Sequence, residues 1–329
     1  MKKFLKLLLI SVLAVATALT MVACDGATPS GSSKKGVDGA VTEKGIYEVR
    51  KYYAEDGVDT LDLGAIDLPE GVTEIKIKAN AFAGNTSLKS IKVPSNTVEI
   101  GAGAFAKMVN LEKLELPFVG AEFNANYKHN SSDSVTVTDA ERTIAHIFGT
   151  AEYDGGSQVT VTYGAATTTV YMPLTLKTVI INNEKQEEYN IPMYAFNGVT
   201  AFTNIELKGN IVGIGENAFG GVGGIETIKI PASVKNIYTG AFIGSYIKNF
   251  VFDSACANIK VEDKAFFGCT LLNFVGAGTP AKNTIDLAKF EVATIGRAAF
   301  DLSANEVEYT VKNASGVDAE KVFGETELA

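Results

Sequence analysis

One dipeptide, Ala-Phe, recurs along this 329-residue chain at a nearly constant interval. Four of the six gaps between successive copies are 23, 23, 23 and 24 residues. Such a period is typical of a solenoid, in which each turn is one supersecondary unit that buries its apolar side chains against the neighbouring turns. The seven copies place phenylalanine at Phe82, Phe105, Phe196, Phe219, Phe242, Phe266 and Phe300.

A fixed frame of apolar residues surrounds the dipeptide. In one copy, Leu114 and Leu116 alternate with polar residues as in a half-buried β-strand, and Pro117 then removes a backbone donor and ends the pairing. A second frame ends in isoleucine and glycine, as at Ile214 and Gly215, and we expect the glycine to permit a sharp turn. The strand frames open at nine positions: Val58, Leu88, Leu111, Leu176, Phe202, Ile225, Ile247, Leu271 and Glu306.

The repeated unit resembles the BspA-like class of bacterial leucine-rich repeats. It reads L-x-x-I-x-I-P-x-x-V-x-x-I-G-x-x-A-F over roughly residues 58 to 311. The resemblance implies a β-rich leucine-rich-repeat solenoid, right-handed and curved, with about nine repeat turns and several inserts. Phe148 lacks the preceding alanine and is interpreted as a degenerate copy, and Lys208 stands where proline is usual.

The N-terminus has the pattern of a targeting segment. Three lysines precede an apolar run from Leu7 to Ala23, which is typical of a secretory signal rather than of a membrane span. Residues Met21 to Cys24 resemble a lipobox, and this resemblance implies cleavage before Cys24 and a diacylglycerol group on its thiol, which anchors the protein to a membrane. A plain secretory signal with an incidental cysteine is the alternative.

These patterns divide the chain into three parts. Residues 1–23 are expected to be a lipoprotein signal peptide, and residues 24–45, which follow cleavage, a flexible tether rich in glycine, serine, lysine and threonine. Residues 46–329 are expected to form the solenoid. Three inserts interrupt its period, at about 119–143, 149–172 and 276–288.

The second insert is predicted to be a hairpin that projects from one repeat, because two of its segments alternate β-branched or apolar residues with polar ones. It carries Tyr153, Tyr163 and Tyr171, and tyrosine is enriched at interface hot spots. Inserts of a solenoid often form its binding face. The hairpin is therefore either a binding element or only a structural arm.

Two positions of each strand frame face away from the core, because the apolar positions beside them face inward. On two successive strands these pairs are Asn249 with Val251 and Asn273 with Val275. Asparagine supplies donors and acceptors and valine supplies dry contact area, so this row suits an extended polypeptide; ordinary strand-surface residues are the alternative. The other pairs are Thr60 and Asp62, Ser90 and Lys92, Lys113 and Glu115, Thr178 and Ile180, Asn204 and Glu206, Thr227 and Lys229, and Glu308 and Thr310.

The charge balance disfavours one class of partner. The formal net charge is −9, and loss of the three lysines of the signal lowers it to −12. An acidic surface disfavours nucleic acid, whose phosphates need a basic stripe. Four aspartates between Asp56 and Asp67 are interpreted as a solvated cap of the first repeat rather than as a calcium site.

Residues that carry chemistry are few. The two histidines, His129 and His146, have no metal-ligand spacing, and the chain contains no Cys-x-x-Cys, Gly-x-Ser-x-Gly or His-Glu-x-x-His motif. Cys256 and Cys269 either form a disulfide, which an exported protein permits, or remain buried thiols. The sequence predicts no enzyme, no cofactor and no metal site.

The sequence thus predicts a non-enzymatic protein-binding or adhesion module, lipid-anchored at the extracellular face of a bacterial cell membrane. Its partner is expected to be a surface protein of a host or of a microbe. The alternative is an envelope-structural or accessory scaffold for other exported proteins. The candidate binding residues are Tyr153, Tyr163, Tyr171, Asn249, Val251, Asn273 and Val275, and the lipid attachment residue is Cys24.

Overall fold

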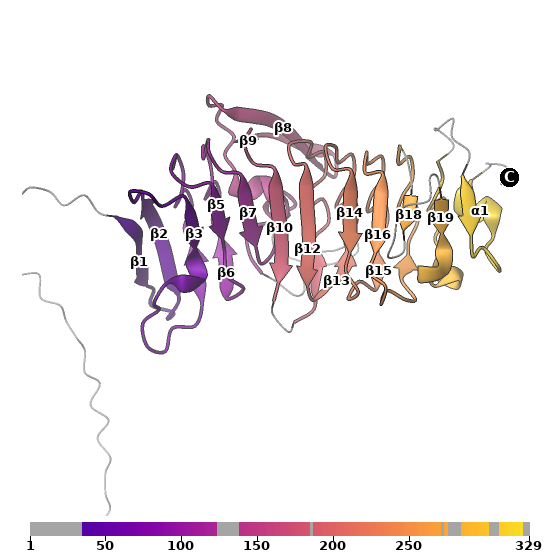
Figure 1. Ribbon diagram of the computed structural model, residues 1–329, viewed down its shortest axis with the longest axis horizontal. Helices are drawn as coiled ribbons and strands as arrows, with labels where there is room; N and C mark the ends of the chain where they lie inside the picture. The colour runs from indigo at the N-terminus through magenta and orange to yellow at the C-terminus, as the bar shows by residue number, and fades with distance from the viewer. Residues whose placement is uncertain are drawn as a thin grey trace, which may run out of the picture. The chain divides into compact units, whose positions relative to one another are not determined.

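The computed structural model describes residues 35–123, 138–184, 187–270, 273–275, 284–302 and 309–324. Within the compact unit that begins at Lys35, strands of successive turns stand side by side in a regular row (Figure 1). Cys24, the expected signal peptide, the first part of the expected tether, His129 and Glu308 lie outside the described residues.

One wall of the solenoid is a row of parallel strands, which we call the front ladder. Its strands follow the predicted frames, and their inward residues, such as Leu114 and Leu116, are fully buried. This arrangement confirms the predicted leucine-rich-repeat solenoid of about nine turns. In chain order the rungs are β3 (Thr60–Asp62), β5 (Ser90–Lys92), β7 (Lys113–Leu116), β10 (Thr178–Asn183), β12 (Asn204–Gly209), β14 (Thr227–Ile230), β16 (Asn249–Phe252) and β18 (Asn273–Val275).

A second wall, the back ladder, is built from the shorter frames that end in isoleucine or valine. Between β6 and β11 its place is taken by the 3-10 helices η2 (Ala140–Arg142) and η3 (Ile144–Ile147). Gly103 N donates to His146 O and Ile144 N donates to Ala195 O, so this segment bridges the turns on either side and confirms the degenerate copy at Phe148. The strands are β2 (Tyr47–Tyr53), β4 (Ile75–Ile77), β6 (Thr97–Ile100), β11 (Tyr189–Ile191), β13 (Ile211–Ile214), β15 (Asn236–Ile237) and β17 (Lys260–Val261).

The phenylalanines of the repeated dipeptide form the core. Phe196 and Phe219 stack with their ring centroids 5.0 Å apart. The next three steps, through Phe242 and Phe266 to Phe300, are each 5.2 Å. All five rings are at most 1% exposed, so each turn buries its ring against the turns on either side.

The glycine that follows isoleucine has a different role from the predicted one. Gly101 and Gly215 do not have a positive φ. A Cβ on Gly101 would lie 2.3 Å from Ala79 N, and one on Gly215 would lie 2.4 Å from Ile191 O. The chain turns directly after both glycines, but neither supplies a positive φ to the turn. Glycine is needed there because the backbone of the preceding turn approaches too closely for any side chain.

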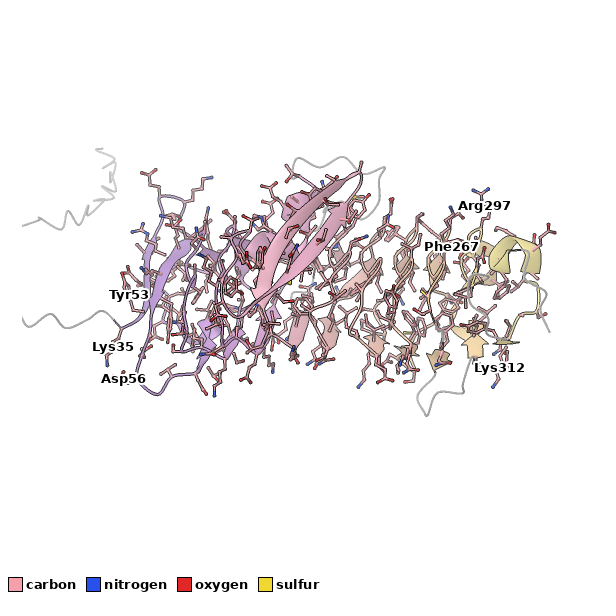
Figure 2. All side chains as sticks on the ribbon, turned by 90° about the horizontal axis from the view of Figure 1, so that it is seen from above. Lys35, Tyr53, Asp56, Phe267, Arg297 and Lys312 are labelled. Carbon is pink, nitrogen blue, oxygen red and sulfur yellow. The ribbon has the colours of Figure 1, made fainter. Side chains whose placement is uncertain are left out.

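The N-terminal end of the unit begins earlier than expected. Strand β1 (Gly36–Val41) pairs antiparallel with β2, although residues 36–41 fall within the predicted tether of residues 24–45. The Lys35 ammonium group lies 2.6 Å from the Asp56 carboxylate beside this strand (Figure 2). The β1–β2 pair covers the first repeat and explains why a polar cap is found there.

The C-terminal end contains a strand that the repeat frame does not predict. Strand β19 (Thr284–Asp286) and helix η4 (Leu287–Lys289) lie in the range 276–288, which was expected to be an insert. The same strand-and-helix unit occurs at β3 and η1 (Leu63–Ala65), where Asp62 accepts from Gly64 N as Asp286 does from Ala288 N. The unit continues through η5 (Val292–Thr294) to β20 (Thr310–Lys312), which pairs parallel with β19, and ends in helix α1 (Ala319–Phe323).

Candidate functional site

The outward residues of the front ladder align from rung to rung, as predicted. Thr227, Asn249 and Asn273 are in register on β14, β16 and β18, and Lys229, Val251 and Val275 are in register two residues further on. Neighbouring rungs of a sheet stand about 4.8 Å apart, so the side chains of Thr227, Asn249 and Asn273 form one continuous row.

Hydrogen bonds join the asparagines of this row into a short chain. Asn249 Nδ2 donates to Thr227 Oγ1 at 3.2 Å, and Asn273 Nδ2 donates to Asn249 Oδ1 at 3.1 Å. The nitrogen of a side-chain amide carries two hydrogens, and these two hydrogen bonds use one hydrogen of Asn249 and one of Asn273. The row therefore presents fixed, repeated polar groups, with Val251 beside them as an apolar contact.

One outward position departs from the prediction. Ile180 on β10 belongs to the outward pairs, yet it is only 3% exposed. Its neighbours in register are Glu115 and Glu206. Glu115 accepts a hydrogen bond from Asn182 at 2.9 Å, which holds its long side chain beside the isoleucine. The physical reason is that long, hydrogen-bonded neighbours shield an apolar side chain even on the outer face.

A hollow of about 640 Å³ opens on the front ladder between β12 and β16. It is the element of the site that the sequence did not predict. Its polar lining comes from outward positions such as Glu206 and Lys229, and its apolar lining from Leu207, Ile230 and Phe252 near the ends of the strands. A volume of this size lies within the range of ligand-binding pockets.

The predicted hairpin is present, but it lies against the solenoid. Its strands β8 (Gly156–Tyr163) and β9 (Ala166–Pro173) pair antiparallel over their whole length. Figure 2 shows both strands crossing obliquely over several turns. Val159, Val161 and Met172 are at most 2% exposed and belong to the main core. The expectation of a projecting hairpin was therefore wrong, because one face of the hairpin is as apolar as the core that it covers.

The three tyrosines of the hairpin region do not form one exposed patch. The hydroxyl of Tyr153 is buried, and burial raises the pKa of Tyr153 to about 12. Tyr163 is partly buried and packs against the core. Tyr171 lies opposite Gln158 in the hairpin and is also partly buried. All three candidates are thus at least partly buried, which favours a structural role for the hairpin.

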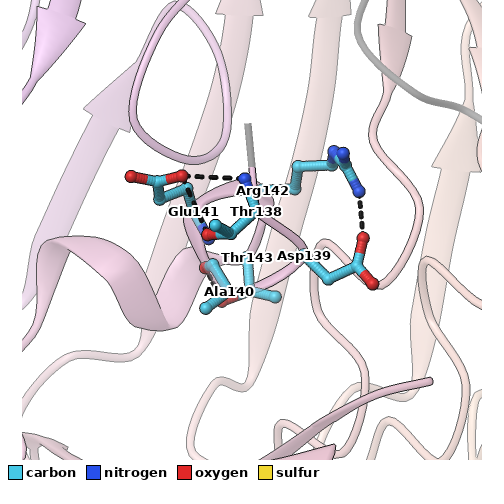
Figure 3. A network of polar contacts seen from close by, with 6 residues as sticks. All are labelled: Thr138, Asp139, Ala140, Glu141, Arg142 and Thr143. Atoms are coloured by element: carbon cyan, nitrogen blue, oxygen red, sulfur yellow. Dashed lines mark hydrogen bonds and ion pairs between the residues drawn. The ribbon is translucent and has the colours of Figure 1, made fainter. Parts of the chain in front are cut away.

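A polar network occupies the start of the segment that replaces a back-ladder strand (Figure 3). The Thr138 backbone N–H and the Thr138 hydroxyl each donate to the Glu141 carboxylate at 2.8 Å, and these two hydrogen bonds lower the pKa of Glu141. Arg142 is 2% exposed and forms an ion pair with Asp139. His146 is partly buried with Nε2 3.1 Å from Ile100 O, and desolvation lowers its pKa. These contacts fix the segment between two turns, which is a packing role.

Cys256 and Cys269 are buried thiols and are not joined by a disulfide. Cys269 lies with its Sγ 3.1 Å from Phe242 O, and burial raises the pKa of its thiol to about 12. Burial also raises the pKa of Cys256. In the described part of the chain, no group of three or more His, Cys, Asp or Glu side chains is arranged to hold a metal ion. Among the described helices, none is both long and apolar enough to cross a membrane.

Comparisons with known proteins agree with this architecture. The sequence model of one protein family, the BspA type leucine rich repeat region, matches this chain in six copies, over residues 58–148 and 168–284. No curated protein matches the chain. Similar solved structures include a leucine-rich-repeat protein of T. pallidum, 17% identical, with a TM-score of 0.35 over 81% of this chain and 86% of that one.

Two further solved structures resemble the chain. A leucine-rich-repeat protein from Bacteroides ovatus is 17% identical, with a TM-score of 0.28 over 85% of this chain and 70% of that one. A leucine-rich cell-surface protein from Faecalibacterium prausnitzii is 14% identical, with a TM-score of 0.24 over 77% of this chain and 96% of that one.

Proposed function

Because the chain belongs to the BspA-type leucine-rich-repeat family, we propose that it is a non-enzymatic module that binds a protein partner through the front ladder. The observation that carries this proposal is the hydrogen-bonded row from Thr227 through Asn249 to Asn273. The row offers repeated donors and acceptors in register, with an apolar residue beside them, and an extended polypeptide chain matches that spacing.

The hairpin is the weaker candidate for the binding face. Its buried valines and the buried Tyr153 hydroxyl support a covering role, because a hot spot needs large side chains that a partner can reach. We therefore place the partner on Asn249, Val251, Asn273 and Val275 and not on Tyr153, Tyr163 or Tyr171.

The location of the module rests on the N-terminal motif. The apolar run and the Met21–Cys24 motif support export and a lipid anchor on Cys24 at the extracellular face of a bacterial membrane. One similar solved protein is described as a cell-surface protein. The alternative, an envelope scaffold, uses the same fold and the same anchor and differs only in the partner.

A capture experiment distinguishes the two functions. The chain from residue 25 onward is immobilised and exposed separately to host extracellular-matrix proteins and to solubilised envelope of the producing cell. The adhesion proposal expects specific capture from the host sample, and the scaffold alternative expects it from the envelope sample.

Variants of the chain identify the face. The double variant Asn249→Lys and Asn273→Lys is expected to lose capture, because two bulky like charges replace the polar row. Tyr171→Ala serves as the matched hairpin control and is expected to retain capture. Retention by the double variant together with loss in Tyr171→Ala would move the site to the hairpin.

A further inference from the structure

The front ladder is interrupted between β12 and β14. These two strands are adjacent, but no ladder of backbone hydrogen bonds joins them. The back ladder runs without a break from β11 to β17, and Phe196 stacks on Phe219 across the same two turns. At this point the front ladder is therefore open, whereas the back ladder and the core between the two ladders are continuous.

The two strands that flank the opening end at different positions. Strand β12 has Lys208 where proline is usual, and it continues in register with β10 as far as Gly209. Strand β14 stops at Ile230, and Pro231 turns the chain away. The two strands differ in length by two residues, and the hollow of about 640 Å³ includes Lys208 and Pro231 in its lining.

Two lysines near other rungs are paired with carboxylates of the preceding turn. The Lys92 ammonium group lies 3.9 Å from the Asp62 carboxylate of the preceding rung. Lys248 lies 3.8 Å from Glu226, which immediately precedes β14. These two lysines are therefore neutralised by a carboxylate one turn away.

Lys229, in the lining of the hollow, has no such partner among the described residues. Its counterpart on β12 is Glu206, but the Glu206 carboxylate is 2.6 Å from Lys208 on its own strand. The hydrogen bond from Lys208 lowers the pKa of Glu206, so this carboxylate is ionised and already neutralised. On β16, the strand on the other side of β14, the residue in register with Lys229 is Val251, which carries no charge. Lys229 is exposed, and in the part of the chain that the structure describes no carboxylate lies within 4.0 Å of its Nζ.

We propose that this hollow binds an extended peptide that carries an acidic side chain next to an apolar one. The acidic side chain pairs with Lys229, and the apolar side chain enters between Leu207 and Phe252, which line the hollow. This inference rests on the proposed function and refines it, because it places the partner's anchor at the break in the ladder and specifies its charge.

The test is a selection of short random peptides displayed on phage against the chain from residue 25 onward. Peptides that bind are then measured individually with Lys229→Glu, with Lys229→Gln and with Lys260→Glu. Lys260 is an exposed lysine on the back-ladder strand β17 and does not line the hollow, so its reversal makes the same change in net charge and is the matched control. Melting curves of all variants verify the fold.

We expect the selected peptides to share an aspartate or glutamate beside an apolar residue. Their affinity should fall about ten-fold or more with Lys229→Glu, less with Lys229→Gln, and should stay unchanged with Lys260→Glu. The absence of binding peptides, binders without an acidic residue, or equal binding by Lys229→Glu would overturn the inference. If the Asn249→Lys and Asn273→Lys variant still loses capture of the protein partner in that case, the proposed function stands without it.

Discussion

In each turn that contains an Ala-Phe pair, the residue directly before the alanine adopts the left-handed backbone conformation. Glycine and asparagine occupy four of these seven positions, in agreement with their low cost in this conformation. Tyr194, Lys264 and Ala298 occupy the other three, with φ between 53° and 62°. The sequence shows the spacing of the pairs but not this conformation, because the residue type varies from one turn to the next. The left-handed residues are Asn80, Gly103, Tyr194, Asn217, Gly240, Lys264 and Ala298.

Ala298→Gly is expected to stabilise the protein. Alanine in the left-handed region destabilises the folded state by about 1–2 kcal/mol, and glycine removes this strain. Glycine also has greater backbone entropy in the unfolded chain, which offsets about half of the benefit, so the expected net stabilisation is roughly 0.5–1 kcal/mol. Urea unfolding measures the change. Gly103→Ala, at the equivalent position of another turn, should be destabilising, and a gain in stability from Gly103→Ala would contradict this account.

The elements of the fold differ in how well the sequence predicts them. The front strands and the hairpin follow from alternating residues and from the fixed frame. Strand β19 was missed because it opens with Thr284 rather than leucine, although Thr284 to Leu287 repeats the pattern of Thr60 to Leu63. The hollow was missed for another reason, since the break between β12 and β14 is a property of two neighbouring turns and does not show as a residue pattern within either strand.

The hairpin provides a prediction at the scale of one element. If it covers the core, Met172→Ala on its buried face should cost about 2–5 kcal/mol in unfolding free energy, as for other large core truncations. Thr160→Ala, on its exposed face, is the matched control and should change stability by no more than about 0.5 kcal/mol. Chemical denaturation gives both values, and equal, small effects would mean that the hairpin is only loosely attached.

The whole molecule combines a solenoid with a proposed anchor that lies outside the described residues. The repeat period is sufficient to predict the solenoid, because each turn contacts only its neighbours and one frame therefore determines many turns. The period says nothing of the partner, since the outward residues are free to vary without disturbing the core. The outward residues of the front ladder are therefore the positions at which a partner can be specified while the repeated core pattern is kept.

Cys24→Ala tests the anchor. Without the thiol no lipid can be attached, and we expect the variant either to appear in the medium or to remain as an unprocessed precursor. Immunoblots of membrane, medium and whole cells measure the distribution and the size of the product. Membrane retention with unchanged processing would show that the Met21–Cys24 motif is not a lipobox.

The central claim is that the front ladder binds the protein partner. Amide hydrogen exchange of the chain, with and without its captured partner, measures this most directly because it reports every rung separately. We predict slower exchange in the partner complex at β14, β16 and β18, and at β12 beside the hollow, with no change in β8 and β9. Slower exchange confined to the hairpin or to the back ladder would contradict the claim.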